Sequence, residues 1–148
     1  LRAAGRSAVR WSETDSGAAP LPEDAVLVVD AIGHLQKFYA ACDIAFVGGS
    51  LIPHGGQNML EPAAQGRAVV FGPHTSNFRT DVELLLREEA AIRVADRDAL
   101  GVELARLCAD EGLRNALGNK ARAVIAQNQG ATARTLARLD DLLGAPVA

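Results

Sequence analysis

Cysteine is scarce in this sequence of 148 residues, which contains only Cys42 and Cys108. Each lies in a stretch of helical periodicity and far from any C-x-x-C spacing. This scarcity argues against a disulfide framework and against a cysteine-ligated zinc site, and it favours a reducing compartment.

A basic surplus and long apolar runs are absent as well. The 15 Lys and Arg residues against 18 Asp and Glu residues give a net charge of −3, so nucleic acid is not the expected partner. The longest uncharged stretches, such as residues 44–59, are interrupted by Gly, Pro, His and Asn, and therefore do not read as membrane spans of about 20 apolar residues. Neither an initiator Met nor an apolar signal segment stands at the start, so we expect a soluble fragment of a longer protein.

Apolar residues make up 49% of the sequence, enough for one folded core at this length. Short apolar runs without in/out alternation predict parallel strands covered on both faces, at 25–30, 44–47, 68–71 and 91–94. Helical periodicity predicts helices at 35–42, 58–65, 78–88, 98–109, 113–126 and 131–143. This alternation predicts the α/β class, with the four strands adjacent in one small doubly wound sheet.

The domain is predicted to span residues 25–148, with its last helices after the sheet. Residues 1–24 are rich in turn formers and are predicted to be a linker segment. Four strands are few for a doubly wound sheet, so further strands are expected upstream of Leu1.

Three loops follow the first three predicted strands, at residues 30–34, 48–58 and 72–78. In open α/β sheets ligands bind outside the carboxyl ends of the strands, so we expect all three loops at one edge of the sheet, forming a binding site there.

The second loop contains two Gly pairs and ends at Asn58, a plausible N-cap for the following helix. Such a loop can present backbone N–H groups to a phosphate or a carboxylate, although an ordinary turn has the same composition. Glu61, one turn into the helix, can complement the helix dipole or accept hydrogen bonds from ribose hydroxyls. Spacing alone does not decide between an anion site and an ordinary turn, or between the two roles of Glu61.

The three histidines, His34, His54 and His74, are not paired at helical spacing and have no adjoining acidic ligand in a known pattern, so no metal site is expected. Arg79 stands at the start of a predicted helix, where a cation is unfavourable unless an anion holds it. It is therefore a candidate ligand residue, with a solvated side chain as the alternative.

Four motifs occur in order between about Val26 and Leu143. They are Phe46-Val-Gly-Gly-Ser-Leu51, Gly55-Gly-Gln-Asn-Met-Leu-Glu-Pro62, Phe71-Gly-Pro-His-Thr-Ser-Asn-Phe78, and Asn128-Gln-Gly-Ala131 with Arg134. Together they closely resemble the C-terminal half of the 3-deoxy-D-manno-octulosonic acid (Kdo) transferases of lipid A biosynthesis.

The resemblance implies a GT-B glycosyltransferase, in which two Rossmann-like domains face a cleft and the C-terminal one binds the donor CMP-Kdo. It further implies that the turn at Gly55, Gly56 and Asn58 holds the donor phosphate, that Glu61 contacts the ribose and that residues 72–77 line the nucleotide pocket. The residues expected to bind the donor are Gly33, Gly49, Ser50, Gly55, Gly56, Gln57, Asn58, Glu61, Gly72, Pro73, His74, Asn77 and Arg79.

The lipid A precursor acceptor and an acidic general base belong, in that family, to an N-terminal domain not contained in these residues. No catalytic residue, cofactor or metal is therefore expected in this chain, and the full-length protein is expected at the cytoplasmic face of the bacterial inner membrane. The alternatives are a catalytically inactive nucleotide-binding or interaction module and another nucleotide-sugar enzyme, such as a UDP-sugar epimerase.

Two positions depart from the family pattern. His34 stands where the family usually has Glu after the first strand, and Gln57 stands in place of His in the Gly-Gly-His-Asn motif. Both changes keep the glycines and alter side-chain donors, so they bear on donor affinity and sugar choice more than on the fold.

Overall fold

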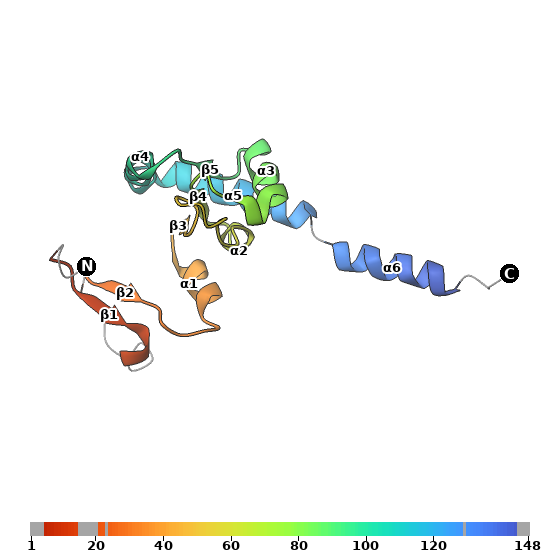
Figure 1. Cartoon of the computed structure of the whole chain (residues 1–148), viewed down its shortest axis with the longest axis horizontal. Helices are drawn as coiled ribbons and strands as arrows, with labels where there is room; N and C mark the ends of the chain where they lie inside the picture. The colour runs from red at the N-terminus through yellow and green to blue at the C-terminus, as the bar shows by residue number, and fades with distance from the viewer. Residues whose placement is uncertain (1–4, 15–20, 23, 129, 145–148) are drawn as a thin grey trace. The chain divides into compact units, whose positions relative to one another are not determined.

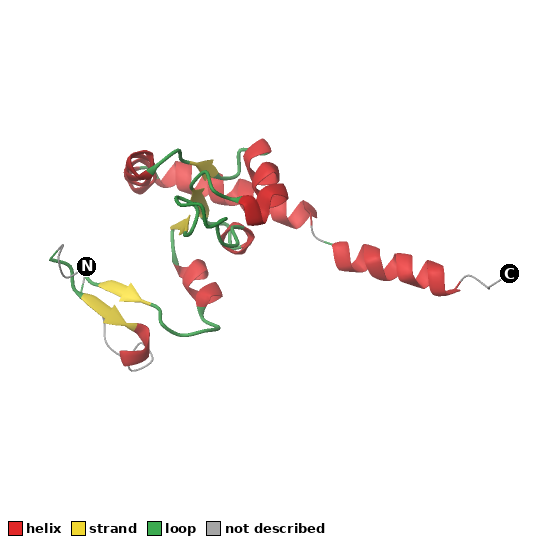
Figure 2. Ribbon diagram, in the orientation of Figure 1, coloured by secondary structure: helices red, strands yellow, loops and turns green. Residues whose placement is uncertain are grey.

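A three-stranded parallel sheet forms the centre of the larger part of the protein (Figures 1 and 2). The computed structural model describes residues 5–14, 21, 22, 24–128 and 130–144. In the sheet, β4 (Ala68–Phe71) lies between β3 (Ile44–Val47) and β5 (Ile92–Arg93), and both pairings are parallel. The α/β class and the parallel arrangement of these strands are confirmed.

The central strand β4 is buried on both faces, as its uninterrupted apolar sequence predicts. One face packs against α2 (Leu60–Ala64), α3 (Arg79–Arg87) and the C-terminal part of α5 (Glu111–Asn128), and Met59, just before α2, is fully buried there. The other face packs against α4 (Arg97–Ala109) and the preceding part of α5. The sheet therefore lies between two layers of helices, and the loops lie at the ends of its strands.

Two compact units divide the chain, residues 1–38 and residues 39–148, and the three-stranded sheet belongs to the second. In the first unit, β1 (Ala8–Arg10) pairs in parallel with β2 (Val26–Val28), with Val9 opposite Leu27. The short 3-10 helix η2 (Trp11–Glu13) follows β1. The helix α1 (Leu35–Ala41) runs across the boundary between the units.

The prediction that four adjacent strands form one sheet is wrong for the first of them, because β2 pairs with β1 and not with β3. Its residues Val26 and Val28 are 37% and 39% exposed, so β2 is not covered on both faces either. A two-stranded sheet gives a strand only one neighbour and leaves its flanks open. The sequence pattern also missed β1, whose three residues are too few to show a period. The division of the chain at residue 24 stays a prediction.

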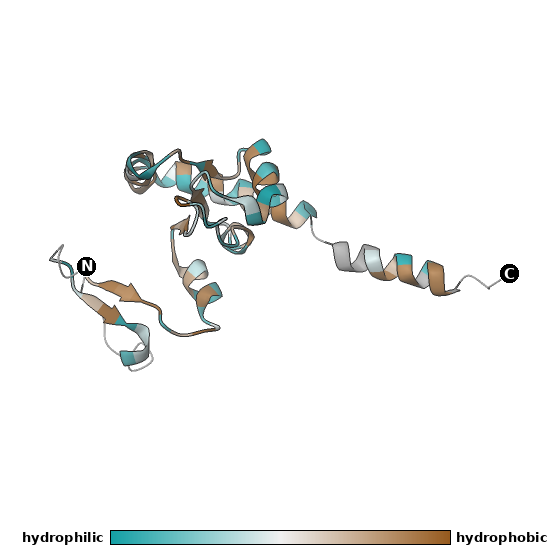
Figure 3. Ribbon diagram, viewed as in Figure 1, coloured by the Kyte–Doolittle hydropathy of each residue, from teal (hydrophilic) through white to brown (hydrophobic). Residues whose placement is uncertain are grey.

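The last helix, α6 (Ala131–Gly144), carries exposed leucines, and Figure 3 shows apolar residues gathered towards its end. These leucines are Leu136, Leu139, Leu142 and Leu143. Within the described part of the chain, no helix is long and apolar enough to cross a membrane.

Candidate functional site

The loops after β3 and β4 lie together at the carboxyl edge of the three-stranded sheet. The backbone N–H of His74 donates to the carbonyl of Ser50 at 2.9 Å, and the N–H of Asn77 donates to the carbonyl of Gly55 at 3.2 Å. The prediction that the second and third loops share one edge is confirmed. Parallel pairing of β3 with β4 brings this about, since it places both carboxyl ends on the same side.

Ser50 is fully buried and fastens the two loops to each other. Its hydroxyl donates to the carbonyl of Val47 at 2.5 Å and accepts a hydrogen bond from the N–H of Gly72 at 2.8 Å. A Cβ at Gly72 would collide with the carbonyl of Ser50, so only glycine permits this approach. Ser50 and Gly72 were both predicted to bind the donor. In the structure the hydroxyl of Ser50 contacts the backbone of Val47 and Gly72.

The glycine turn between β3 and α2 is closed by a hydrogen bond from the N–H of Gly56 to the carbonyl of Gly49 at 3.1 Å. Gly55 has φ of +95°, and a Cβ there would come within 2.5 Å of the side-chain nitrogen of Asn77. That nitrogen donates to the carbonyls of His54 and Gly56 at 3.4 and 3.5 Å. The turn and the third loop therefore hold each other in one shape.

Asn58 and Glu61 are joined at the start of α2. The Asn58 side-chain oxygen accepts from the N–H of Leu60 at 2.9 Å, and its nitrogen donates to Glu61 Oε1 at 3.1 Å. The helix begins at Leu60 with Met59 in the N-cap position, so the prediction that Asn58 is the N-cap is wrong by one residue, although its side chain still satisfies a helix N–H. The carboxylate of Glu61 is thereby held at the edge of the glycine turn.

The carboxylate of Glu61 interacts electrostatically with the phenol of Tyr39. The sequence pattern did not predict a role for Tyr39. Burial raises the pKa of the Tyr39 phenol above its ordinary value, and the negative charges of Glu61 and Cys42 raise it further. The phenol therefore stays protonated at neutral pH.

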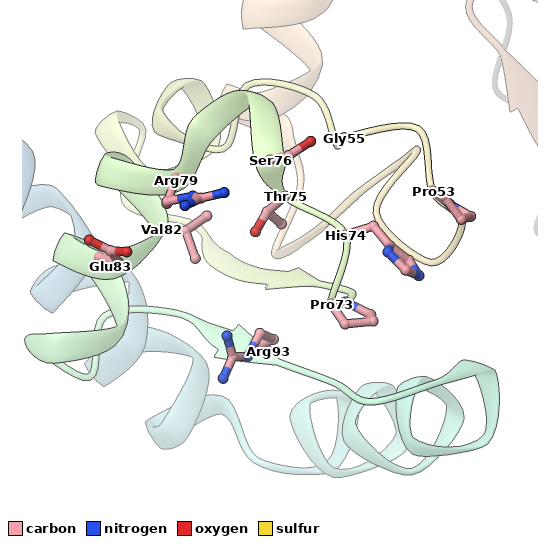
Figure 4. Close-up of a pocket in the computed structure, with 10 residues that line it drawn as sticks. All are labelled: Pro53, Gly55, Pro73, His74, Thr75, Ser76, Arg79, Val82, Glu83 and Arg93. Carbon is pink, nitrogen blue, oxygen red and sulfur yellow. The ribbon is translucent and has the colours of Figure 1, made fainter.

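A cavity of about 510 Å³ opens between the third loop, α3 and β5 (Figure 4). It is lined by Pro53, Gly55, Pro73, His74, Thr75, Ser76, Arg79, Val82, Glu83 and Arg93. The short 3-10 helix η3 (Ser76–Phe78) leads from the third loop into α3, and this turn brings Arg79 to the rim. Of the predicted donor-binding residues, the cavity brings together Gly55, Pro73, His74 and Arg79.

Sequence reasoning missed Arg93, the last residue of β5. Its signal is a charged residue inside the apolar run 91–94, at the carboxyl end of a strand. Within the described residues, neither Arg93 nor Arg79 forms a side-chain hydrogen bond or an ion pair. Glu83 is the one carboxylate that lines the cavity, so its charged lining has a positive excess.

The other predicted residues lie apart from the cavity. Gln57 is exposed beside the glycine turn, and Asn58 and Glu61 lie beyond it. Gly33 is exposed at φ of +88° in the loop after β2, within the first unit. The prediction that this loop joins the site stays a prediction.

His34, next to Gly33, packs its ring at 5.9 Å from the ring of Trp11, and its Nδ1 is buried without a hydrogen-bond partner. His54 and His74 are exposed in the second unit. In the part of the chain that the structure describes, no three His, Cys, Asp or Glu side chains gather in a way that could hold a metal ion.

Comparisons with known proteins identify relatives over most of the chain, although no family model matches it. It is 43% identical over 145 residues to a 3-deoxy-D-manno-octulosonic acid transferase of Bordetella pertussis, covering 97% of this chain and 33% of that enzyme. A transferase of the same name from Haemophilus influenzae is 40% identical over 119 residues, which are 80% of this chain and 27% of that enzyme. The chain thus spans about a third of the length of these curated relatives.

A solved structure is similar as well. The C-terminal CMP-Kdo binding domain of WaaA from Acinetobacter baumannii superposes with a TM-score of 0.73 at 29% identity, over 84% of this chain and 63% of that domain. The similarity in sequence and the similarity in structure therefore point to the same group of proteins.

Proposed function

We propose that this chain, which belongs with the C-terminal part of the Kdo transferase family, binds CMP-Kdo as the donor-binding part of a GT-B glycosyltransferase. The observation that carries the proposal is the similarity to a solved CMP-Kdo binding domain. The joined glycine loops at the carboxyl edge of the sheet support it, since this edge is where α/β sheets bind ligands.

In the proposed complex the donor phosphate lies at the turn formed by Gly49, Gly55 and Gly56. The fixed shape of this turn supports the assignment, because a preformed backbone loses little entropy on binding. The ribose hydroxyls donate to Glu61, whose carboxylate Asn58 already orients. Residues 72–77 line the nucleotide pocket, and Ser50 acts by positioning that loop.

In the proposed reaction a hydroxyl of the acceptor, a lipid A precursor, attacks the anomeric carbon of Kdo. The bond from that carbon to the phosphate oxygen breaks, CMP leaves with the electron pair and the configuration is inverted. The acceptor proton passes to an acidic base that we assign to the N-terminal part of the full-length protein. Stabilising the leaving phosphate is the task of this chain, and it requires no metal. Because the acceptor is a lipid, we place the full-length enzyme at the cytoplasmic face of the inner membrane.

Calorimetric titration with CMP, UDP and AMP tests the proposal. We expect CMP to bind at least about tenfold more tightly than UDP or AMP, because a site that hydrogen-bonds a particular base leaves buried groups unpaired with another. Preference for UDP would instead support a UDP-sugar enzyme of the same architecture. Absence of nucleotide binding would support an interaction module.

A further inference from the structure

Arg93 is the last residue of the edge strand β5. It pairs with Phe71 in the parallel register between β5 and β4, so its side chain leaves the sheet on the same face as Phe71. That face is the one covered by α3, whose residues Val82 and Leu85 pack in the same cluster as Phe71. Arg93 is itself exposed, so its guanidinium lies at the border of this apolar cluster and lines the cavity from the end of the edge strand.

Arg79 reaches the same cavity from the first turn of α3. Figure 4 shows the two arginine side chains on opposite sides of Val82, one from the helix and one from the strand. Hydroxyl groups of Thr75 and Ser76 also line the cavity. Both arginines are exposed and have no side-chain partner among the described residues, and Glu83 is the one carboxylate in the lining. The remaining positive charge and the hydroxyl donors suit a small planar anion.

The donor that the proposed function assigns carries two acidic groups, the phosphate and the carboxylate of the sugar acid. The glycine turn accounts for the phosphate alone. Gly55 belongs both to that turn and to the lining of the cavity, so a group attached to a phosphate at the turn can extend into the cavity. The loop at 72–77 therefore borders both the proposed nucleotide pocket and this cavity. Glu61, the proposed ribose contact, lies outside the cavity lining, so the ribose does not occupy the end of the cavity beside Arg79 and Arg93.

We propose that Arg93 and Arg79 form a subsite that binds the carboxylate of the donor's sugar acid. Arginine suits this role because its planar guanidinium donates two parallel hydrogen bonds to a carboxylate. The inference rests on the proposed function and adds Arg93 to it as a residue that sets sugar specificity.

The test compares CMP with CMP-Kdo on the full 148-residue chain and on the variants Arg93→Gln, Arg93→Lys and Arg79→Gln. Affinities are measured by calorimetry, and circular dichroism checks that each variant is folded. Arg97→Gln is the matched control, since Arg97 is an exposed arginine that does not line the cavity. The quantity of interest is the ratio of the two affinities within one protein, which cancels any loss of folded material.

We expect Arg93→Gln and Arg79→Gln each to weaken CMP-Kdo binding by about tenfold or more while CMP binding changes less than about twofold, because a charge-assisted hydrogen bond is lost. Arg93→Lys should recover part of the affinity and Arg97→Gln should match the wild type.

An unchanged ratio in Arg93→Gln would overturn the subsite and leave Arg93 as a residue of the sheet edge. Equal losses for CMP and CMP-Kdo would also overturn it, because they would assign the guanidinium to the phosphate or the nucleoside. Failure of the wild type to bind either compound would overturn the proposed function itself, and the subsite with it.

Discussion

The hydroxyl of Ser50 and the backbone N–H of Gly72 are joined at 2.8 Å inside the protein, where they connect the loops after two neighbouring strands. The same hydroxyl donates to Val47, at the end of β3. These two hydrogen bonds connect the loop after β3 and the loop after β4 to the end of β3. Because the carbonyl of Ser50 also accepts a hydrogen bond from the N–H of His74, Ser50 positions the third loop, which lines the cavity.

Replacing Ser50 by Ala should lower the free energy of unfolding by about 1–3 kcal/mol, because the buried N–H of Gly72 then lacks an acceptor. Chemical denaturation measures this change. Ser76→Ala serves as the control, since Ser76 is exposed and should leave stability within about 0.5 kcal/mol of the wild type. A Ser50→Ala protein as stable as this control would contradict the stabilising role of the hydroxyl.

Two helical glycines should respond to alanine in opposite directions. A Cβ at Gly118 of α5 would collide with the carbonyl of Gly66, so Gly118→Ala should destabilise the protein by about 1–3 kcal/mol through overpacking. A Cβ at Gly101 of α4 meets nothing within 4 Å, so Gly101→Ala should stabilise by up to about 1 kcal/mol through helix propensity. Melting curves of both variants compare the two effects. A Gly118→Ala protein as stable as the wild type would contradict the close approach of α5 to the turn at Gly66, and a destabilised Gly101→Ala protein would contradict the open space at Gly101.

Glu61→Ala should weaken CMP binding by about 1.5–3 kcal/mol, because a charged acceptor for the ribose hydroxyls is removed. Titration calorimetry measures the loss. Glu61→Gln separates the charge from the shape of the side chain, and Glu111→Ala, at the start of α5, is a control remote from the glycine turn. Equal affinity of wild type and Glu61→Ala would leave Glu61 with only its contact to Asn58.

The two cysteines should differ in reactivity. Cys42 is half-buried and its thiol donates to the carbonyl of Tyr39 at 3.4 Å, whereas Cys108 is exposed on α4. Burial raises the pKa of the Cys42 thiol above its ordinary value, so less thiolate is present at neutral pH. Mass spectrometry after limited iodoacetamide treatment should find Cys108 alkylated first. Cys42 should gain on it as the pH rises, and a faster reaction at Cys42 would show that its segment opens readily.

The 148 residues alone should bind CMP and transfer no sugar. Positioning of donor, acceptor and base together can contribute about 7–11 kcal/mol to lowering the barrier, and we assign only the donor side to this chain. An assay with CMP-Kdo and a lipid A precursor measures turnover, with the chain joined to an N-terminal acceptor domain as the positive control. Turnover by the chain alone would locate the base among these residues.

Burial explains why the central strand of the larger unit was predictable. Every residue of β4 is covered, so its apolar run has no polar interruption to obscure it, and β3 shows a similar run. Pairing is a different matter, because the partner of a strand depends on contacts between distant segments. The sequence therefore predicts a strand at 25–30, which the structure has at 26–28, and does not reveal that it pairs with β1.

The loops of the site were predictable because glycine, proline and asparagine mark turns through backbone restrictions that act locally. What a side chain does within a turn depends on its neighbours in space. The sequence predicts Ser50 as a ligand residue because it follows two glycines. In the structure its hydroxyl is hydrogen-bonded to the backbone of Val47 and Gly72. In the sequence Arg93 is a single charged residue in an apolar run. Only its register with Phe71 shows on which face of the sheet its side chain lies.

Met59 is the single methionine of the sequence, and its side chain is fully buried where the glycine turn meets α2. Peroxide converts a thioether to a sulfoxide only when it can reach the sulfur. The oxidation rate of this one side chain therefore measures how often the segment before α2 opens to solvent. A ligand that binds the adjoining turn should slow that oxidation. The mass shift of Met59 oxidation can therefore report ligand binding without an added label.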